Sequence, residues 1–119
     1  GLILVIDDEK QVLNVAEKIL KFCGYNVITA TDGYAGLEIF REREKEIKAV
    51  LLDYSMPGIS GIEVLVDLKK INPEVKVLLV SGFIEAGLIE TSREKGISDF
   101  LRKPFTAAEL SEKIKKIQN

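Results

Sequence analysis

Residues 2–8 read LILVIDD, an unbroken apolar run that ends in two aspartates, and this stretch decides the fold. A second stretch of the same kind, AVLLD, occupies residues 49–53 and ends in Asp53. Continuous apolar runs are typical of parallel strands that are buried on both faces of a sheet. Ligands of open α/β sheets bind beyond the carboxyl ends of the strands. If these two strands are neighbours, we expect Asp7, Asp8 and Asp53 to meet in one crevice.

Such an acidic crevice needs a compensating positive charge. Like charges a few ångströms apart cannot all stay ionised, and a divalent cation with oxygen ligands removes the repulsion. The cluster therefore predicts a Mg²⁺ site formed by Asp7, Asp8 and Asp53, with a nearby backbone carbonyl, that of Ser55, as a further oxygen ligand.

Length and composition fit one compact domain over residues 1–119, with 46% apolar and 30% charged residues. Lys and Arg number 17 and Asp and Glu 19, a formal net charge of −2. This balance provides no overall basic field for direct binding of nucleic acid or of an anionic membrane. Without a stretch of membrane-spanning length or a signal peptide, we expect a cytoplasmic protein.

Histidine is absent and cysteine occurs once. Catalysis by a histidine base and histidine-ligated zinc are therefore excluded within this chain, and any histidine must come from a partner. The single cysteine, Cys23, cannot form an intrachain disulfide. Its place at the end of an apolar helical pattern predicts a buried structural thiol.

Apolar runs alternate with segments of helical period five times, which predicts a parallel sheet covered by helices on both faces. The expected strands are residues 2–6, 25–30, 49–52, 77–80 and 97–101. The expected helices cover residues 12–23, a segment around Leu37 and Phe40, residues 60–71, residues 84–95 and the segment that follows Thr106. Capping-box patterns begin at Ser60 and Thr106, and Gly87 weakens the fourth helix.

The polarity of the strands predicts their order in the sheet. The strands at residues 2–6, 49–52 and 77–80 are apolar throughout and should be central, whereas the other two carry polar residues such as Asn26 and Asp99. This favours a flavodoxin-like (βα)5 doubly wound sheet of order 2-1-3-4-5, whose switch point falls between the two aspartate-bearing strands.

Two further polar residues, Ser81 and Lys103, follow the fourth and fifth strands on the same side of the sheet. A carboxylate, a metal site, a hydroxyl and a lysine are the parts needed to accept a phosphoryl group, because positioned positive charge stabilises its transition state. Asp53 is the predicted nucleophile, and Lys103 is expected to pair with it at rest and with the phosphoryl oxygens afterwards. Alone, each residue would be explained better as a helix cap or an ordinary turn or loop residue, and it is their combination at the strand ends that favours phosphoryl transfer.

Four segments in this order resemble the receiver domain of two-component response regulators, over essentially the whole chain. They are Val5-Ile6-Asp7-Asp8-Glu9, Leu51-Leu52-Asp53-Tyr54-Ser55-Met56-Pro57-Gly58 with Gly61 behind it, Val80-Ser81-Gly82, and Lys103-Pro104-Phe105.

The resemblance implies that Asp53 takes a phosphoryl group from a phosphohistidine on a histidine kinase or a histidine phosphotransfer domain, with Mg²⁺ and slow self-hydrolysis. The resemblance implies a domain that is not a conventional enzyme by itself, because it catalyses only its own aspartyl phosphorylation and dephosphorylation. Ser81 would turn toward the phosphoryl group and Phe100 would swing inward, changing the face made by the fourth helix, fifth strand and fifth helix, which also allows a homodimer. Ser81 replaces the commoner threonine, Phe100 lacks a tyrosine hydroxyl, and bulky Phe83 is expected to shield the phosphoryl group from water.

Three other functions stay open. A haloacid-dehalogenase-like phosphatase usually needs a second aspartate two residues after the nucleophile, where this chain has Ser55. A flavin mononucleotide binder needs a phosphate loop after the first strand, where the acidic residues 7–9 would repel phosphate. An unphosphorylated protein-binding module would not need the acidic set, Ser81 and Lys103.

The output domain or partner is unknown. The segments Ser81-Gly82-Phe83 and Lys103-Pro104-Phe105 look most like receivers of hybrid histidine kinases, although a free-standing regulator or a transcription factor would also contain such a domain.

Overall fold

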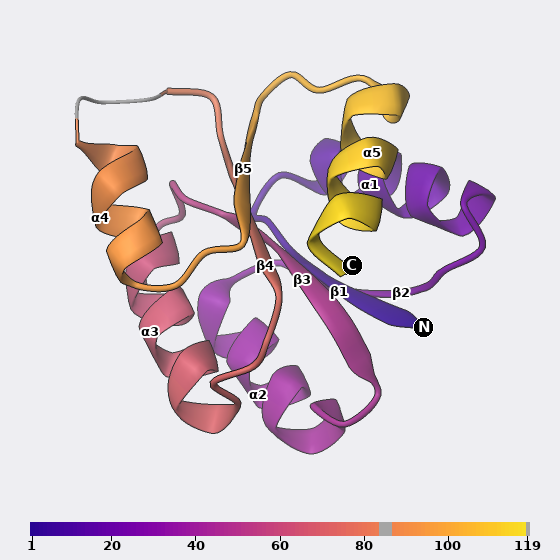
Figure 1. Ribbon diagram of the computed structural model, residues 1–119. Helices are drawn as coiled ribbons and strands as arrows, with labels where there is room; N and C mark the ends of the chain where they lie inside the picture. Colours follow the sequence, from indigo (N-terminus) through magenta and orange to yellow (C-terminus); the bar gives the residue numbers. More distant parts are fainter. Residues whose placement is uncertain (84–86, 119) are drawn as a thin grey trace.

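The computed structural model describes residues 1–83 and 87–118, and strands and helices alternate through them (Figure 1). The strands are β1 (Leu2–Ile6), β2 (Asn26–Ala30), β3 (Ile47–Asp53), β4 (Val77–Ser81) and β5 (Asp99–Arg102). The helices are α1 (Lys10–Phe22), α2 (Gly33–Arg43), α3 (Gly61–Ile71), α4 (Leu88–Glu94) and α5 (Ala107–Gln118).

The five strands form one parallel sheet in the order β2-β1-β3-β4-β5, which confirms the predicted topology. The three apolar strands are central and the two strands with polar residues are at the edges. Ile6 pairs with Leu52 and Asp53 pairs with Val80. This register brings the residues that follow β1, β3 and β4 to the same edge of the sheet.

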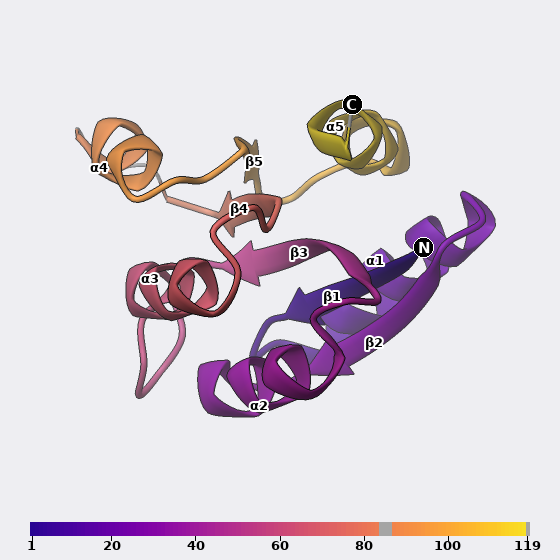
Figure 2. The same ribbon diagram turned by 60° about the horizontal axis from the view of Figure 1, so that its bottom comes forward.

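Helices cover both faces of the sheet, with α1 and α5 on one side and α2 and α3 on the other (Figure 2). Alternate residues of the central strands enter the two cores. Ile3 and Val5 pack in the core under α1 and α5, whereas Leu4 and Ile6 pack in the core under α2 and α3. Because both faces are buried, the inner parts of these strands, residues 2–6, 49–52 and 77–80, are apolar at every position.

Both predicted capping boxes are present. The Ser60 hydroxyl accepts a hydrogen bond from the Glu63 backbone N–H, and the Glu63 carboxylate accepts one from the Ser60 N–H. Thr106 and Glu109 exchange the same pair of bonds at the start of α5. These bonds satisfy backbone donors that a helix terminus leaves free, so each helix begins at a defined residue.

The structure corrects two predictions. Helix α4 begins at Leu88, not at Ile84, because Gly87 has a left-handed backbone (φ 85°) and precedes the helix instead of lying within it; residues 84–86 lie outside the described part of the chain. Cys23 is exposed, not buried. The buried stripe of α1 ends at Leu20, and Cys23 is the residue that caps the end of the helix.

None of the helices within residues 1–83 and 87–118 is long and apolar enough to cross a membrane.

Candidate phosphoacceptor site

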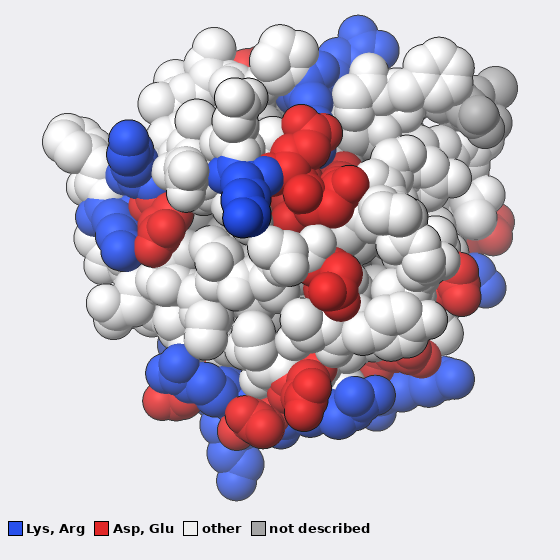
Figure 3. Space-filling model, turned by 180° about the vertical axis from the view of Figure 1, so that it is seen from behind, with Lys and Arg blue, Asp and Glu red and all other residues white. Residues whose placement is uncertain are grey.

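The predicted acidic cluster forms at the ends of β1 and β3. One carboxylate oxygen from each of Asp7, Asp8 and Asp53 lies within 4.8 Å of the others. Asp7 and Asp53 are each 3% exposed, whereas Asp8 lies at the surface. Figure 3, a view from behind, shows acidic side chains gathered in the upper middle of that face. The convergence inferred from the two strand ends is therefore present in the structure.

Lys103 supplies the positive charge inside this cluster. Its Nζ lies 2.8 Å from Asp7 Oδ2 and 3.3 Å from Asp53 Oδ1, and only 13% of the side chain is exposed. The Lys103 backbone N–H donates to the Ser81 carbonyl oxygen (2.9 Å), which fixes the segment after β5 against the end of β4. Glu9 Oε1 is a third acceptor at 3.5 Å, a contact that the sequence analysis did not foresee.

The environment raises the pKa of Asp53 to about 7. Burial is the largest cause, and the negative charge of Asp7 acts in the same direction, whereas Lys103 opposes both. For Lys103, burial lowers the pKa, but the hydrogen bond to Asp7 and the charges of Asp53 and Asp7 outweigh burial, so that its pKa is raised. The single positive charge of Lys103 thus offsets only part of the negative charge of the two buried carboxylates, Asp7 and Asp53.

One oxygen of Asp53 is available for a further ligand. Asp53 Oδ2 is buried and has no hydrogen-bond partner within the described residues. A buried carboxylate oxygen without a partner is costly, and a hard cation would satisfy it. The Asp7, Asp8 and Asp53 carboxylates are the oxygen donors that Mg²⁺ prefers, so the residues fit this ion.

Gly61 allows the turn after β3 to pack closely. A Cβ at this position would lie 2.6 Å from the Asp53 carbonyl oxygen and 2.6 Å from Tyr54 Cα. The Gly61 N–H donates to the Tyr54 carbonyl oxygen at 3.0 Å. The turn that leaves Asp53 is therefore folded tightly onto the start of α3. Ser55, the residue expected to offer its carbonyl, lies exposed in this turn.

Ser81 is buried, with 2% of its surface exposed, and is hydrogen-bonded to the loop after β4. Its hydroxyl donates to the Phe83 carbonyl oxygen (2.7 Å) and accepts from the Phe83 N–H (3.2 Å). In the described residues no hydrogen bond joins Ser81 to Asp53. The structure therefore brings Ser81 to the edge of the site, with its hydroxyl bound to its own loop.

The two aromatic residues singled out from the sequence differ in burial. Phe100 on β5 is half-buried and packs against the core under α2 and α3. Phe83 is 69% exposed. Phe100 thus occupies a position between the core and the surface.

A hollow of about 620 Å³ opens beside Lys103, between α1 and the segment that joins β5 to α5. It is lined by Glu9, Gln11, Val12, Val15, Gly82, Lys103, Pro104 and Phe105.

The fold and this site define a class of protein, and comparison with known proteins agrees. The response regulator receiver domain family matches residues 3–115. The chain therefore belongs to this family, the phosphoacceptor signalling domains of two-component systems. Receiver domains interact with histidine kinases or phosphotransfer proteins and with output domains, and they bind Mg²⁺ at an acidic pocket.

Two curated relatives illustrate the range of the family. Sporulation initiation phosphotransferase F of Bacillus subtilis (strain 168) is 30% identical over 114 residues, which cover 96% of this chain and 90% of that protein. The probable transcriptional regulator ycf27 of Porphyridium aerugineum is 34% identical over 115 residues, 97% of this chain. The chain spans only 47% of ycf27, so it is about half as long as that relative.

Solved structures agree with this assignment. A response regulator receiver domain protein from Clostridium thermocellum superposes with a TM-score of 0.92 at 36% identity, covering 100% of this chain and 94% of that one. The CheX–CheY–BeF3–Mg complex of Borrelia burgdorferi contains a chain that superposes with a TM-score of 0.94 at 25% identity, covering 98% and 87%. Because the chain belongs to the receiver family, this assignment takes the place of the two alternatives, a haloacid-dehalogenase-like phosphatase and a flavin mononucleotide binder.

Proposed function

We propose that Asp53 is the residue that accepts the phosphoryl group, with the phosphohistidine of a histidine kinase or of a phosphotransfer domain as donor. The observation that carries this proposal is the state of the Asp53 carboxylate. It is buried, one oxygen is 3.3 Å from the Lys103 ammonium, and the other has no partner within the described residues. In this proposal the unpartnered oxygen is available to the metal ion, and the oxygen that pairs with Lys103 at rest attacks phosphorus once Lys103 turns to the phosphoryl oxygens.

Asp7, Asp8, Asp53 and the Ser55 backbone carbonyl would hold Mg²⁺ in this proposal. When bound, the ion would supply positive charge that offsets the negative charge of the acidic cluster and of the incoming phosphoryl group. By the same effect it favours the ionised form of Asp53, whose pKa of about 7 otherwise leaves a large protonated fraction near neutral pH.

The transfer step forms one bond and breaks one. An oxygen of the ionised Asp53 carboxylate attacks phosphorus, and the bond between phosphorus and the donor's imidazole nitrogen breaks. The electron pair of that bond stays on the imidazole, and Asp53 becomes an aspartyl phosphate. Lys103 then pairs with phosphoryl oxygens and keeps its contact with Asp7, which lies 2.8 Å away at rest.

Phosphorylation of Asp53 would change the surface formed by α4, β5 and α5. In the proposed response, Ser81 gives up its bonds to Phe83 and turns to the phosphoryl group, and Phe100 moves inward. Lys113 joins α5 to β5 through Asp99 (3.1 Å), so a change at β5 reaches α5 directly. This face would bind the output partner or a second copy of the chain. We also propose a cytoplasmic location, which is typical of receiver domains.

The test is intact mass spectrometry after incubation with a small-molecule phosphodonor. With Mg²⁺ the protein is expected to gain one phosphoryl group, which alkali or hydroxylamine removes because it is an acyl phosphate. With excess chelator the gain should disappear. A gain that persists in chelator, or that resists hydroxylamine, contradicts the proposal.

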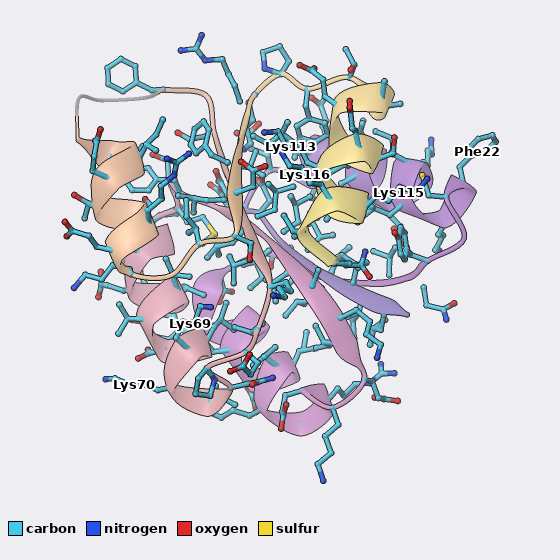
Figure 4. The ribbon with its side chains drawn as sticks, in the orientation of Figure 1. Phe22, Lys69, Lys70, Lys113, Lys115 and Lys116 are labelled. Atoms are coloured by element: carbon cyan, nitrogen blue, oxygen red, sulfur yellow. The ribbon has the colours of Figure 1, made fainter. Side chains whose placement is uncertain are left out.

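We infer that the donor protein binds the surface next to the site. An outer stripe of α1, namely Val12, Val15, Ile19 and Phe22, recurs at helical spacing. Val15 is 48% exposed and Phe22 is 95% exposed. Figure 4 shows Phe22 pointing away from the end of α1. The hollow beside Lys103 borders this stripe, and a second hollow of about 380 Å³ continues it between α1 and α5.

We therefore expect Val15→Ser and Phe22→Ser together to slow transfer from a phosphohistidine protein about tenfold or more, because exposed apolar anchors carry much of the affinity of such interfaces. Phosphorylation by a small-molecule donor should be unchanged. Tyr34→Ser is the matched control, since Tyr34 is also exposed (66%) but lies on α2, across the sheet. Transfer kinetics from a purified donor check this, and equal loss with both donors would contradict it.

A further inference from the structure

Helix α4 has a small buried face that includes a polar residue. Its buried residues are Leu88, 7% exposed, and Ser92, which is completely buried. Ser92 Oγ has no hydrogen-bond partner among the residues that the structure describes. Buried hydroxyls nearly always have a partner. This one destabilises the packed position of α4, because water would satisfy it if the helix moved away.

The other four helices each bury three or four residues, whereas α4 buries two. Helix α5 buries three apolar residues, Leu110, Ile114 and Ile117, and its serine, Ser111, donates to the Ala108 carbonyl oxygen at 3.2 Å. Helix α4 has only 7 residues, and no side chain caps its first turn, which follows Gly87. The weak attachment is therefore particular to α4.

The loop that precedes α4 is tied to the phosphoacceptor site through Ser81. The Ser81 hydroxyl makes two hydrogen bonds with the Phe83 backbone, at 2.7 and 3.2 Å. If Ser81 turns to a phosphoryl group on Asp53, these bonds are lost. The backbone of Phe83, on the N-terminal side of α4, is then no longer held by Ser81.

We propose that the unpartnered Ser92 hydroxyl lowers the free energy needed to displace α4, and that Ser92 thereby sets how readily the α4-β5-α5 face responds to phosphorylation. This proposal rests on the proposed function, since it assigns a determinant of the same response. The hydroxyl disfavours the resting position and leaves the displaced position unaffected, so it shifts the equilibrium between them. Because phosphorylation and displacement are coupled, the same shift favours phosphorylation.

The test compares Ser92→Ala with wild type, with and without beryllofluoride and Mg²⁺, the pair present in the Borrelia burgdorferi complex. Beryllofluoride mimics a phosphoryl group on a carboxylate. Without it, Ser92→Ala is expected to raise Tm by about 3–5 °C, the shift for removing one unsatisfied hydroxyl from a domain of this size. With it, the rise should fall to less than about half, because the displaced helix exposes Ser92 to water. Ser111→Ala is the control and should change Tm equally in both states.

Hydrogen exchange of the unliganded proteins gives a readout that does not depend on phosphorylation. Amides of Leu88–Glu94 are expected to exchange about tenfold more slowly in Ser92→Ala than in wild type. An equal Tm rise in both states, no rise at all, or unchanged exchange in α4 would each overturn the role of Ser92. Failure of wild type to bind beryllofluoride would instead count against the proposed function, and the exchange result would still decide the question of Ser92.

Discussion

Asp53→Asn is expected to take up no phosphoryl group from either a small-molecule or a protein donor. Asparagine has nearly the same shape, so the turn that ends at Gly61 and the surrounding core should remain intact. Its amide carries no negative charge and is a poor nucleophile, so the bond to phosphorus cannot form. Intact mass spectrometry under conditions that phosphorylate wild type completely provides the measurement.

Asp67→Asn is the matched control for this loss. Asp67 lies on α3 and its carboxylate is 3.9 Å from Lys70, away from the acidic cluster, so this variant should be phosphorylated like wild type. Uptake by Asp53→Asn equal to that of the control would show that another residue is the acceptor. Loss of uptake in both variants would show that the effect is not specific to Asp53.

The sheet could be predicted almost completely from the sequence because its signal is local. Leu2–Ile6 and Val77–Val80 are apolar at every position, which is typical of strands with both faces buried. The acidic cluster could be predicted as well, because each aspartate follows a strand directly and the register of a parallel sheet aligns the strand ends. One inference about burial and one about strand order were enough to place the cluster.

Features that depend on the packing of distant elements could not be predicted. The contact of Glu9 with Lys103 joins residues 94 positions apart, and nothing in the local sequence of either residue indicates it. The exposure of Cys23 depends on where α1 ends relative to α5, and the apolar pattern of the helix does not contain that information. The close packing of Gly61 against Asp53 and Tyr54 is only weakly indicated in the sequence, by a glycine at the start of a predicted helix.

The pH dependence of stability is the second large expected effect. The carboxyl group of Asp53 has a pKa of about 7 in the folded protein, against an ordinary value of 3.8. A raised pKa means that the folded state holds the proton more tightly than the unfolded state. The resulting stabilisation is fully present below about pH 4 and is lost as pH rises through 7.

For the metal-free protein, this loss is expected to be on the order of 3 kcal/mol between pH 4 and pH 8, after allowance for screening by solvent at the mouth of the site. Asp53→Asn lacks the titrating group, so its free energy of unfolding should exceed that of wild type by a margin that grows over this range. Lys103 does not contribute, because its raised pKa lies above 10.5. Urea unfolding of both proteins in chelator, at several pH values, measures the margin.

Addition of Mg²⁺ completes the argument, because the ion and the proton compete for the same carboxylate. At pH 8 Mg²⁺ should stabilise wild type strongly and Asp53→Asn less, whereas at pH 4 it should stabilise neither. A margin between the two proteins that stays constant from pH 4 to pH 8 would mean that the Asp53 carboxylate is compensated within the protein. The acidic cluster would then have no need of a cation, and the reason for assigning Mg²⁺ to it would be lost.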